Sequence, residues 1–312
     1  NMNYRRFFTF LLLLTPIFAY ASGNTGGGGG KSAGQVQNSG GSFDGELDKS
    51  RQEALNERKG QSSNFDHTHF SFSDILKKNV IKLKDSRGSQ INYKNVNKEK
   101  LNSYIQSALE QKKEVVDAWS REKQLSYYFN LYNALTIELI LRNYPIKSIK
   151  ELGSGFPFYQ SPWKRKFFFL FGEMSYLDRI EHELTRGNSN LLDPLVHFAF
   201  NCASIGCPAL LDEAFTYSNL EQQLQKITKQ FLKDRNRNYI KEGTAYVSSI
   251  FKWYRGDFEK GLRGFNSLKD FFSFYAESLA DTPKQFKILK NRSYEIKYLE
   301  YDWALNDKNL ND

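Results

Sequence analysis

The stretch SREKQLSYYFNLYNALTIELILRNY, residues 120–144, is the longest helical pattern in this sequence, and the rest of the fold has to accommodate it. Its apolar side chains, Leu125 and Phe129 among them, recur at helical spacing and cover a wide arc. Ser120 is a typical N-cap residue, and Pro145 ends the pattern. An apolar arc of this width predicts a helix that is buried on most of its sides.

Two asparagines, Asn130 and Asn133, lie inside this apolar arc, three residues apart and on one face of the helix. Buried amides cost free energy unless they find hydrogen-bond partners. One interpretation is that both side chains clamp the backbone of a loop. The other is that one of them orients a catalytic residue.

Shorter patterns on both sides of this helix mix helical and strand periodicity. A tight turn at Asp85–Gly88 precedes a strand over 90–96, and a hairpin is predicted over 166–176. Further helices are predicted over 72–80, 97–109, 175–185, 217–233 and 268–279, and strands within 238–250 and over 294–301. We therefore expect an α+β fold: a helix-rich single domain with a small antiparallel sheet, for which a papain-like arrangement is one candidate.

The composition divides the 312 residues into three parts. Residues 1–21 have a basic start, an apolar run and an Ala-Tyr-Ala site, which is the pattern of a signal peptide. Residues 22–63 form a Gly/Ser-rich linker that buries too little apolar surface to fold. Residues 64–312 form the globular domain, and no run in them is long enough to span a membrane. We expect an exported protein, periplasmic or secreted.

The net charge of +9 comes from scattered lysines and arginines. Such a charge favours solubility or attraction to anionic polymers of the cell envelope. No basic-aromatic motif of a nucleic-acid module is present, so we expect no specific nucleic-acid partner.

Reactive side chains concentrate in YLDRIEH, residues 176–182, and DPLVHFAFNCASIGCP, residues 193–208. These segments hold both cysteines and two of the four histidines. Thiols, imidazoles and carboxylates are the groups of nucleophilic catalysis, zinc binding and disulfides. The candidate site residues here are Asp178, Glu181, His182, His197, Asn201, Cys202 and Cys207.

One hypothesis makes Cys207 a catalytic nucleophile. It stands directly before Pro208, where the start of a helix or turn would expose N–H groups that lower the pKa of a thiol. His182 or His197 would act as base or acid, and backbone N–H groups near Cys202 would bind an oxyanion. The third member that orients the base would be one of Asn130, Asp178 and Asn201.

Three alternatives remain open. Cys202 and Cys207 are close enough in sequence to form a disulfide, either a structural staple or a redox pair. The two cysteines with His182 and His197 could bind zinc, although their spacing matches no common zinc module. Lastly, these side chains could simply be buried in the core.

The motifs FNLYNALT (129–136), SYLDRIEH (175–182), the 193–208 segment and YDWALN (301–306) resemble the domain of unknown function 547 family. The resemblance extends over about 65–306, with an apolar Ile205-Gly206 where the family often has a polar or basic residue. The family has no agreed activity, but some eukaryotic members are fused to glutaredoxin-like modules. The resemblance implies these motif residues: Asn130, Asn133, Asp178, Glu181, His182, Asp193, His197, Asn201, Cys202, Cys207 and Pro208.

We therefore expect an exported thiol-centred domain, with a papain-like cysteine hydrolase or acyltransferase as the leading hypothesis. The alternative is a non-catalytic binding or scaffolding protein of the cell envelope with a Cys202–Cys207 disulfide or a thiol-redox pair. Neither hypothesis requires a cofactor. The sequence names no substrate, and an envelope peptide or protein is the class we expect.

Overall fold

The long helix is the structural centre of the residues that the computed structural model describes, which are 65–83, 88–153 and 161–310. Helix α5 (Arg121–Asn143) begins where the Ser120 side chain accepts a hydrogen bond from the backbone of Lys123. Every residue from Leu125 to Leu141 is buried, which confirms the prediction from the apolar arc.

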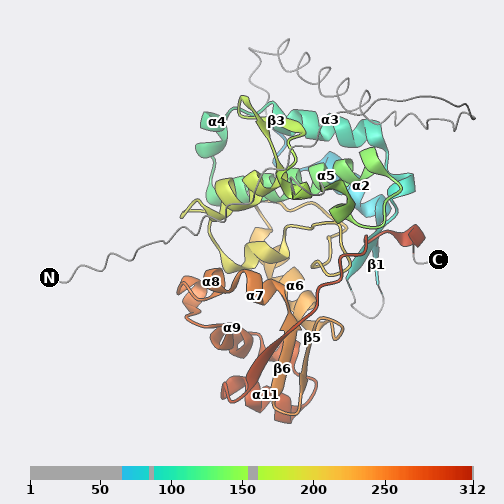
Figure 1. Ribbon diagram of the computed structural model, residues 1–312. Helices are drawn as coiled ribbons and strands as arrows, with labels where there is room; N and C mark the ends of the chain where they lie inside the picture. Colours follow the sequence, from blue (N-terminus) through green and yellow to red (C-terminus); the bar gives the residue numbers. More distant parts are fainter. Residues whose placement is uncertain (1–64, 84–87, 154–160, 311–312) are drawn as a thin grey trace, which may run out of the picture. The chain divides into compact units, whose positions relative to one another are not determined.

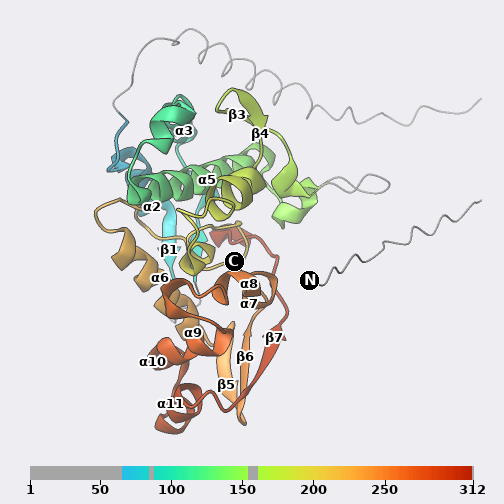
Figure 2. The ribbon, with the colours of Figure 1, turned by 90° about the vertical axis from the view of Figure 1, so that its left-hand side faces the viewer.

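Several short elements pack beside α5, and Figures 1 and 2 show α2 and α3 next to it. The strand predicted over 90–96 is shorter than expected, because the chain turns into a 3-10 helix directly after Ile91. Residues 85–87 of the predicted turn lie outside the described residues. The elements on this side are α2 (Phe70–Asn79), β1 (Val80–Lys82), β2 (Ser89–Ile91), η1 (Tyr93–Asn95), α3 (Lys98–Leu109), α4 (Lys113–Asp117), η2 (Ile149–Leu152) and η3 (Pro162–Lys164).

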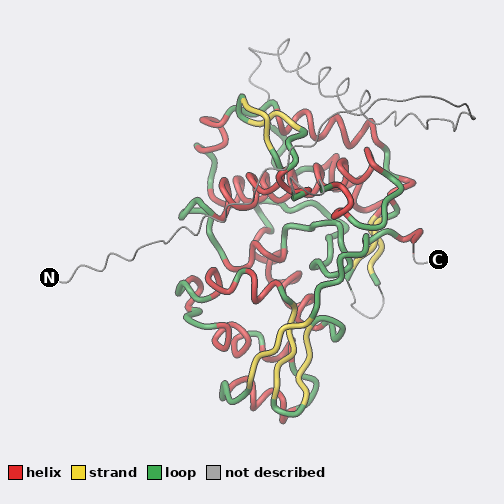
Figure 3. Tube along the Cα trace, in the orientation of Figure 1, coloured by secondary structure: helices red, strands yellow, loops and turns green. Residues whose placement is uncertain are grey.

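The strands form three separate small sheets (Figure 3). Strands β1 and β2 pair antiparallel, and so do β3 (Phe168–Leu170) and β4 (Glu173–Ser175), as predicted for a hairpin. The third sheet has the order β5–β6–β7, with β5 (Asn238–Lys241) and β6 (Thr244–Ser248) antiparallel.

Strand β7 (Glu295–Leu299) lies parallel to β6, which differs from a purely antiparallel sheet. Parallel pairing needs a long crossover connection, and here helices supply it. The helix predicted over 268–279 is broken at Tyr275, and α11 was not predicted although Thr282 and Gln285 form a capping box. The crossover contains α7 (Ile250–Trp253), α8 (Arg255–Phe258), η6 (Leu262–Gly264), α9 (Leu268–Phe274), α10 (Ala276–Leu279) and α11 (Pro283–Lys290).

A phenylalanine cluster fills the core next to this third sheet. Phe251 packs against Phe258, Phe271 and Phe272, and Phe198 joins the cluster from the central part of the chain. Helix α6 (Leu220–Lys233) closes it on one side, and its N-cap residue is Asn219. None of the described helices combines the length and apolarity needed to cross a membrane.

Candidate functional site

The first group of site residues lies on η4 (Arg179–Arg186), a π-helix that follows strand β4. The sequence predicts a helix over 175–185, and the structure brings the candidate residues Asp178, Glu181 and His182 of this segment together. The Nε2 atom of His182 is 3.6 Å from an oxygen of Asp178, and its Nδ1 is 3.9 Å from an oxygen of Glu181. Short π-helical turns occur often at functional sites.

Arg186 and Asp257 connect the two histidines of the cluster. The Arg186 guanidinium donates to Nδ1 of His182 at 2.7 Å and to a carboxylate oxygen of Asp257 at 2.7 Å. The same oxygen of Asp257 lies 2.9 Å from Nε2 of His197. The His197 ring is fully buried and stacked on Tyr254, so it is positioned as a structural group rather than as an accessible base.

The asparagines of the motif act as backbone clamps. Asn130 donates to the carbonyl of Phe215 at 2.7 Å and accepts from the N–H of the same residue at 2.9 Å. Asn133 bonds in the same way to the Ala199 carbonyl and the Asn201 N–H. The clamp interpretation therefore describes both side chains, and neither of them contacts a histidine in these hydrogen bonds.

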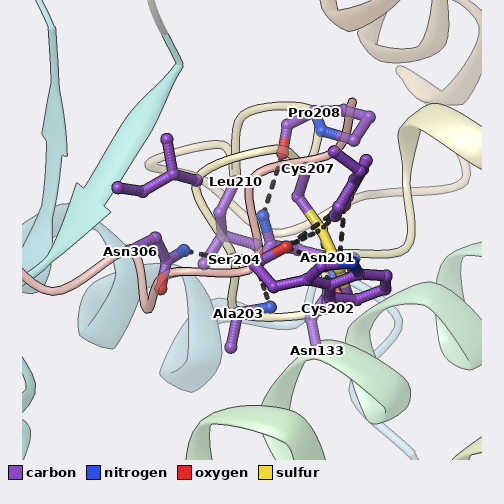
Figure 4. Close-up of a disulfide and its surroundings, with 12 residues drawn as sticks. Asn133, Asn201, Cys202, Ala203, Ser204, Cys207, Pro208, Leu210 and Asn306 are labelled. Carbon is purple, nitrogen blue, oxygen red and sulfur yellow. Dashed lines mark hydrogen bonds between the residues drawn. A yellow bond between two sulfur atoms is a disulfide. The ribbon is translucent and has the colours of Figure 1, made fainter. Parts of the chain in front are cut away.

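Asn201 extends this set into the cysteine loop. Its side chain donates to the Pro208 carbonyl at 2.9 Å and accepts from the Ala203 N–H at 3.0 Å, which holds the two ends of the loop together (Figure 4). Ala203 adopts a left-handed conformation (φ 60°), which costs energy for a residue other than glycine. We call Asn130, Asn133 and Asn201 the amide clamp.

Cys202 and Cys207 form a disulfide, with their Cα atoms 6.3 Å apart. Their surroundings differ, because Cys202 is partly exposed whereas only 3% of Cys207 is exposed. The Cys207 sulfur accepts a hydrogen bond from the Cys202 N–H at 2.9 Å and one from the Tyr301 hydroxyl at 3.1 Å. No helix begins at Pro208 in the described part of the chain, so the donor expected from a helix start is supplied by the Cys202 N–H instead.

The C-terminal motif YDWALN pairs with this loop. Backbone hydrogen bonds run from Ile205 to Ala304 and from Gly206 to Asp302, each at 2.8 Å. A Cβ atom at Gly206 would lie 2.9 Å from the Asp302 carbonyl, so this close approach requires glycine. The pairing places the Tyr301 hydroxyl 3.1 Å from both sulfurs.

These parts enclose a cleft with a cavity volume of about 370 Å³. Both cysteines and the side chains of Asp178, Glu181 and His182 line it. Among the described residues, no lysine or arginine lines the cleft. One large part of its wall is aromatic, formed by Tyr132, Trp163, Phe200, Trp253, Tyr254, Tyr301 and Trp303.

Residues 116–232 match the family model described as protein of unknown function, DUF547. The match confirms the predicted resemblance over this range and contains η4, the amide clamp and the disulfide loop. Tyr254, Asp257 and Tyr301 complete the site from outside the DUF547 match. No curated protein and no solved structure matches the chain, so a papain-like arrangement stays a prediction.

The carboxyl groups of the DUF547 region that line the cleft have raised pKa values. Burial raises the pKa of Asp178, and the neighbouring His182 only partly opposes this. Burial also raises the pKa of Glu181, although His197 and a hydrogen bond from Tyr254 counteract it. Burial lowers the pKa of His182, so its imidazole is neutral at neutral pH.

Asp257, which stands behind the cleft, shows the opposite behaviour. Burial alone would raise its pKa, but hydrogen bonds from His197, Arg186 and Lys260 hold the pKa well below the usual range. The carboxyl groups that line the cleft and the carboxylate of Asp257 behind it thus differ in whether they have cationic partners. Perturbed pKa values of this kind are frequent at functional sites.

The structure does not support the zinc alternative. Within the described residues, no three His, Cys, Asp or Glu side chains are arranged to hold a metal ion. His197 faces Asp257 and the sulfurs face Tyr301 and each other.

Sequence reasoning missed the part of the site that comes from the C-terminal third. Asp257 and the aromatic residues Trp253, Tyr254 and Tyr301 carry no local pattern that connects them with the cysteines. The YDWALN motif was the one available signal, because Tyr301 is its first residue.

Proposed function

We propose that this protein is an exported thiol–disulfide exchange protein in which Cys202 is the attacked sulfur and Cys207 the leaving group. The proposal rests on the different exposure of the two cysteines of the bridge. An incoming thiol would reach the partly exposed Cys202 through the cleft, whereas Cys207 is buried among hydrogen-bond donors. Exchange proceeds faster when the leaving thiolate is stabilised.

The reaction needs no group other than a substrate thiol. A thiolate attacks the Cys202 sulfur, the Cys202–Cys207 bond breaks, and its electron pair remains on Cys207. The Cys202 N–H at 2.9 Å and the Tyr301 hydroxyl at 3.1 Å would stabilise that thiolate. A second substrate thiolate then attacks the substrate sulfur of the mixed disulfide, Cys202 leaves as a thiolate, and the substrate disulfide is released. Two thiols are thus oxidised, and their two protons and two electrons end on Cys202 and Cys207 as thiol groups.

The test compares two single-cysteine variants. Cys207→Ala leaves the accessible Cys202, and Cys202→Ala leaves the buried Cys207. We expect glutathione disulfide to form a mixed disulfide at least about tenfold faster with Cys207→Ala, measured by intact mass. The reverse order would overturn the assignment, and a wild-type bridge that resists thiols until the protein unfolds would identify a structural staple.

Export is tested separately by expressing the complete chain with its own N-terminus. We expect the extracytoplasmic form to begin directly after Ala21, as measured by intact mass and N-terminal sequencing. An uncleaved chain retained in the cytoplasm would refute this part of the proposal.

A cysteine hydrolase or acyltransferase active in the reduced state is a second candidate. One observation favours it: Cys207 and His182 line the same cleft, and the Cys202 N–H is directed at the Cys207 sulfur. Reduced protein should then release a burst of nitrophenol from a nitrophenyl ester, and Cys207→Ser should abolish the burst. Both nitrogens of His182 already face Arg186 and Asp178, which makes this the weaker candidate.

A further inference from the structure

The carboxyl groups of the cleft lack the arginine partners that four other buried carboxylates in this protein have. Glu138, Asp193, Asp234 and Asp257 each form an ion pair with an arginine. Glu181 is only 7% exposed and lines the cleft, yet within the described residues it forms no ion pair with a lysine or arginine. Its contacts are the Tyr254 and Tyr132 hydroxyls and the His182 ring, and Arg186 and His197 act on it through their charge alone. A buried carboxylate without a cation is costly, and a cationic ligand would remove that cost.

Asp178 adds to this difference between the cleft carboxyl groups and the buried carboxylates that pair with arginine. Its recorded ion-pair partner is His182, which is neutral at neutral pH for the reasons given above. Lys164 lowers the pKa of Asp178 without lining the cleft, and Arg186 donates to Asp257 and to His182. The cleft therefore presents two carboxyl groups to a ligand and no lysine or arginine from the described residues.

The aromatic wall of the cleft is also compatible with a positively charged ligand. Lys150 already places its ammonium 5.3 Å from the ring centroid of Trp303, and Arg186 lies 4.7 Å from that of Tyr254. These rings attract cations through their π faces. Trp253 packs on Trp303 and remains 48% exposed at the cleft, so it offers a further ring surface to an entering ligand.

We infer that the cleft selects small thiols that carry an ammonium group, which would reach Cys202 beside Asp178 and Glu181. This inference rests on the proposed thiol–disulfide exchange. A sphere with the volume of the cavity, about 370 Å³, is about 9 Å across, which is close to the screening length at physiological salt. The carboxylates of the cleft and the ammonium group of the attacking thiol would thus interact with little screening by salt.

The test uses the oxidised full chain and three thiols that differ in charge: cysteamine, 2-mercaptoethanol and mercaptoacetate. The rate of bridge reduction by each thiol is divided by its rate with the urea-unfolded protein, which removes differences in intrinsic reactivity. We expect the normalised rate with cysteamine to exceed that with mercaptoacetate by about tenfold or more at low salt. The ratio of the two rates should shrink in 1 M NaCl, because salt screens the attraction between charges.

Two variants locate the effect. Glu181→Gln and Asp178→Asn should each lower the cysteamine-to-mercaptoacetate ratio by about threefold or more. The matched control Glu213→Gln removes a surface carboxylate that pairs with Lys226, and it should leave the ratio unchanged. Circular dichroism verifies that each variant is folded.

The outcomes separate the inference from the proposed function. Equal normalised rates for the three thiols, or a preference for mercaptoacetate, would overturn the charge selection while leaving exchange intact. If no thiol reduces the folded protein, the proposed exchange is refuted. The charge selectivity of the cleft is then tested by itself, by comparing the binding of benzylamine and of benzyl alcohol in calorimetry. Tighter binding of the amine, lost in Glu181→Gln, supports a cation-selective cleft, and equal or weaker binding refutes it.

Discussion

The amide clamp and the cleft carboxyl groups are two polar clusters that differ in how completely their hydrogen-bonding and charge requirements are met. Asn130 is fully buried, and both ends of its amide bond to the backbone of Phe215. Glu181 is nearly as buried, but it has no cationic partner among its recorded contacts and its pKa is raised. The first cluster stabilises the fold, whereas the second lacks a cationic partner, which a ligand can supply.

The comparison teaches that burial of a polar residue does not by itself identify its role. Satisfied amides hold the loop 199–215 against α5 and thereby fix where the disulfide lies. Buried carboxyl groups kept in a cleft without an arginine or lysine partner reduce stability in return for binding or reactivity. Stability measurements should therefore separate the two clusters.

The largest effect is expected for Asn130→Ala. The variant leaves the buried N–H and carbonyl of Phe215 without partners, so the free energy of unfolding should fall by about 4 kcal/mol. Urea denaturation followed by circular dichroism measures it. Asn143→Ala on the same helix removes one bond from a partly exposed side chain and should cost about 1 kcal/mol or less. Equal losses in the two variants would contradict the clamp.

Asp257→Asn should lower the free energy of unfolding by about 3 kcal/mol at neutral pH, because it weakens charged hydrogen bonds from Arg186 and His197. The folded pKa of Asp257 is depressed, so its contribution is present above its ordinary pKa of about 3.8 and is lost as pH falls below that value. Wild-type stability should drop more steeply than that of the variant below about pH 4.

The control for this experiment is Asp281→Asn, whose carboxylate pairs with Arg235 at an exposed position. It should change stability by about 0.5 kcal/mol or less. Parallel pH curves for wild type and Asp257→Asn would show that this carboxylate is not the supporting group.

A smaller effect is expected from losing the disulfide. The bridge closes a short loop, so the Cys202→Ser/Cys207→Ser double variant should lose about 2 kcal/mol of unfolding free energy. Denaturation of the wild type with reductant should give the same value. A loss as large as that of Asn130→Ala would mean that the bridge, rather than the amides, holds the loop in place.

Glu181→Gln should have the smallest effect and the opposite sign, leaving stability at pH 7 unchanged or raising it by up to about 1 kcal/mol. The raised pKa means that Glu181 favours folding below its ordinary pKa of about 4.5 and loses this contribution as pH rises through the folded value. Wild-type stability relative to the variant should thus fall from acidic to neutral pH. A clear destabilisation by the variant at pH 7 would place Glu181 with the structural cluster.

The sequence by itself determined the features that depend on neighbours along the chain. The apolar arc predicted the burial of α5, and Ser120 and Pro145 gave its limits within a residue or two. The grouping of Asp178, Glu181 and His182 follows from their spacing on one turn of helix, and the five-residue separation of Cys202 and Cys207 brings a disulfide within reach. Local backbone geometry fixes such relations before any tertiary contact forms.

Only the tertiary structure decided which polar side chains became clamps and which line the cleft. Asn130 meets Phe215 across 85 residues. Tyr301 reaches Cys207 across 94 residues because strand β7 returns parallel to β6 and the chain after it continues along the disulfide loop. The pairing of His197 with Asp257 likewise joins residues 60 positions apart in the chain. Contacts of this range depend on the packing of the whole core, which leaves no periodic pattern in the sequence.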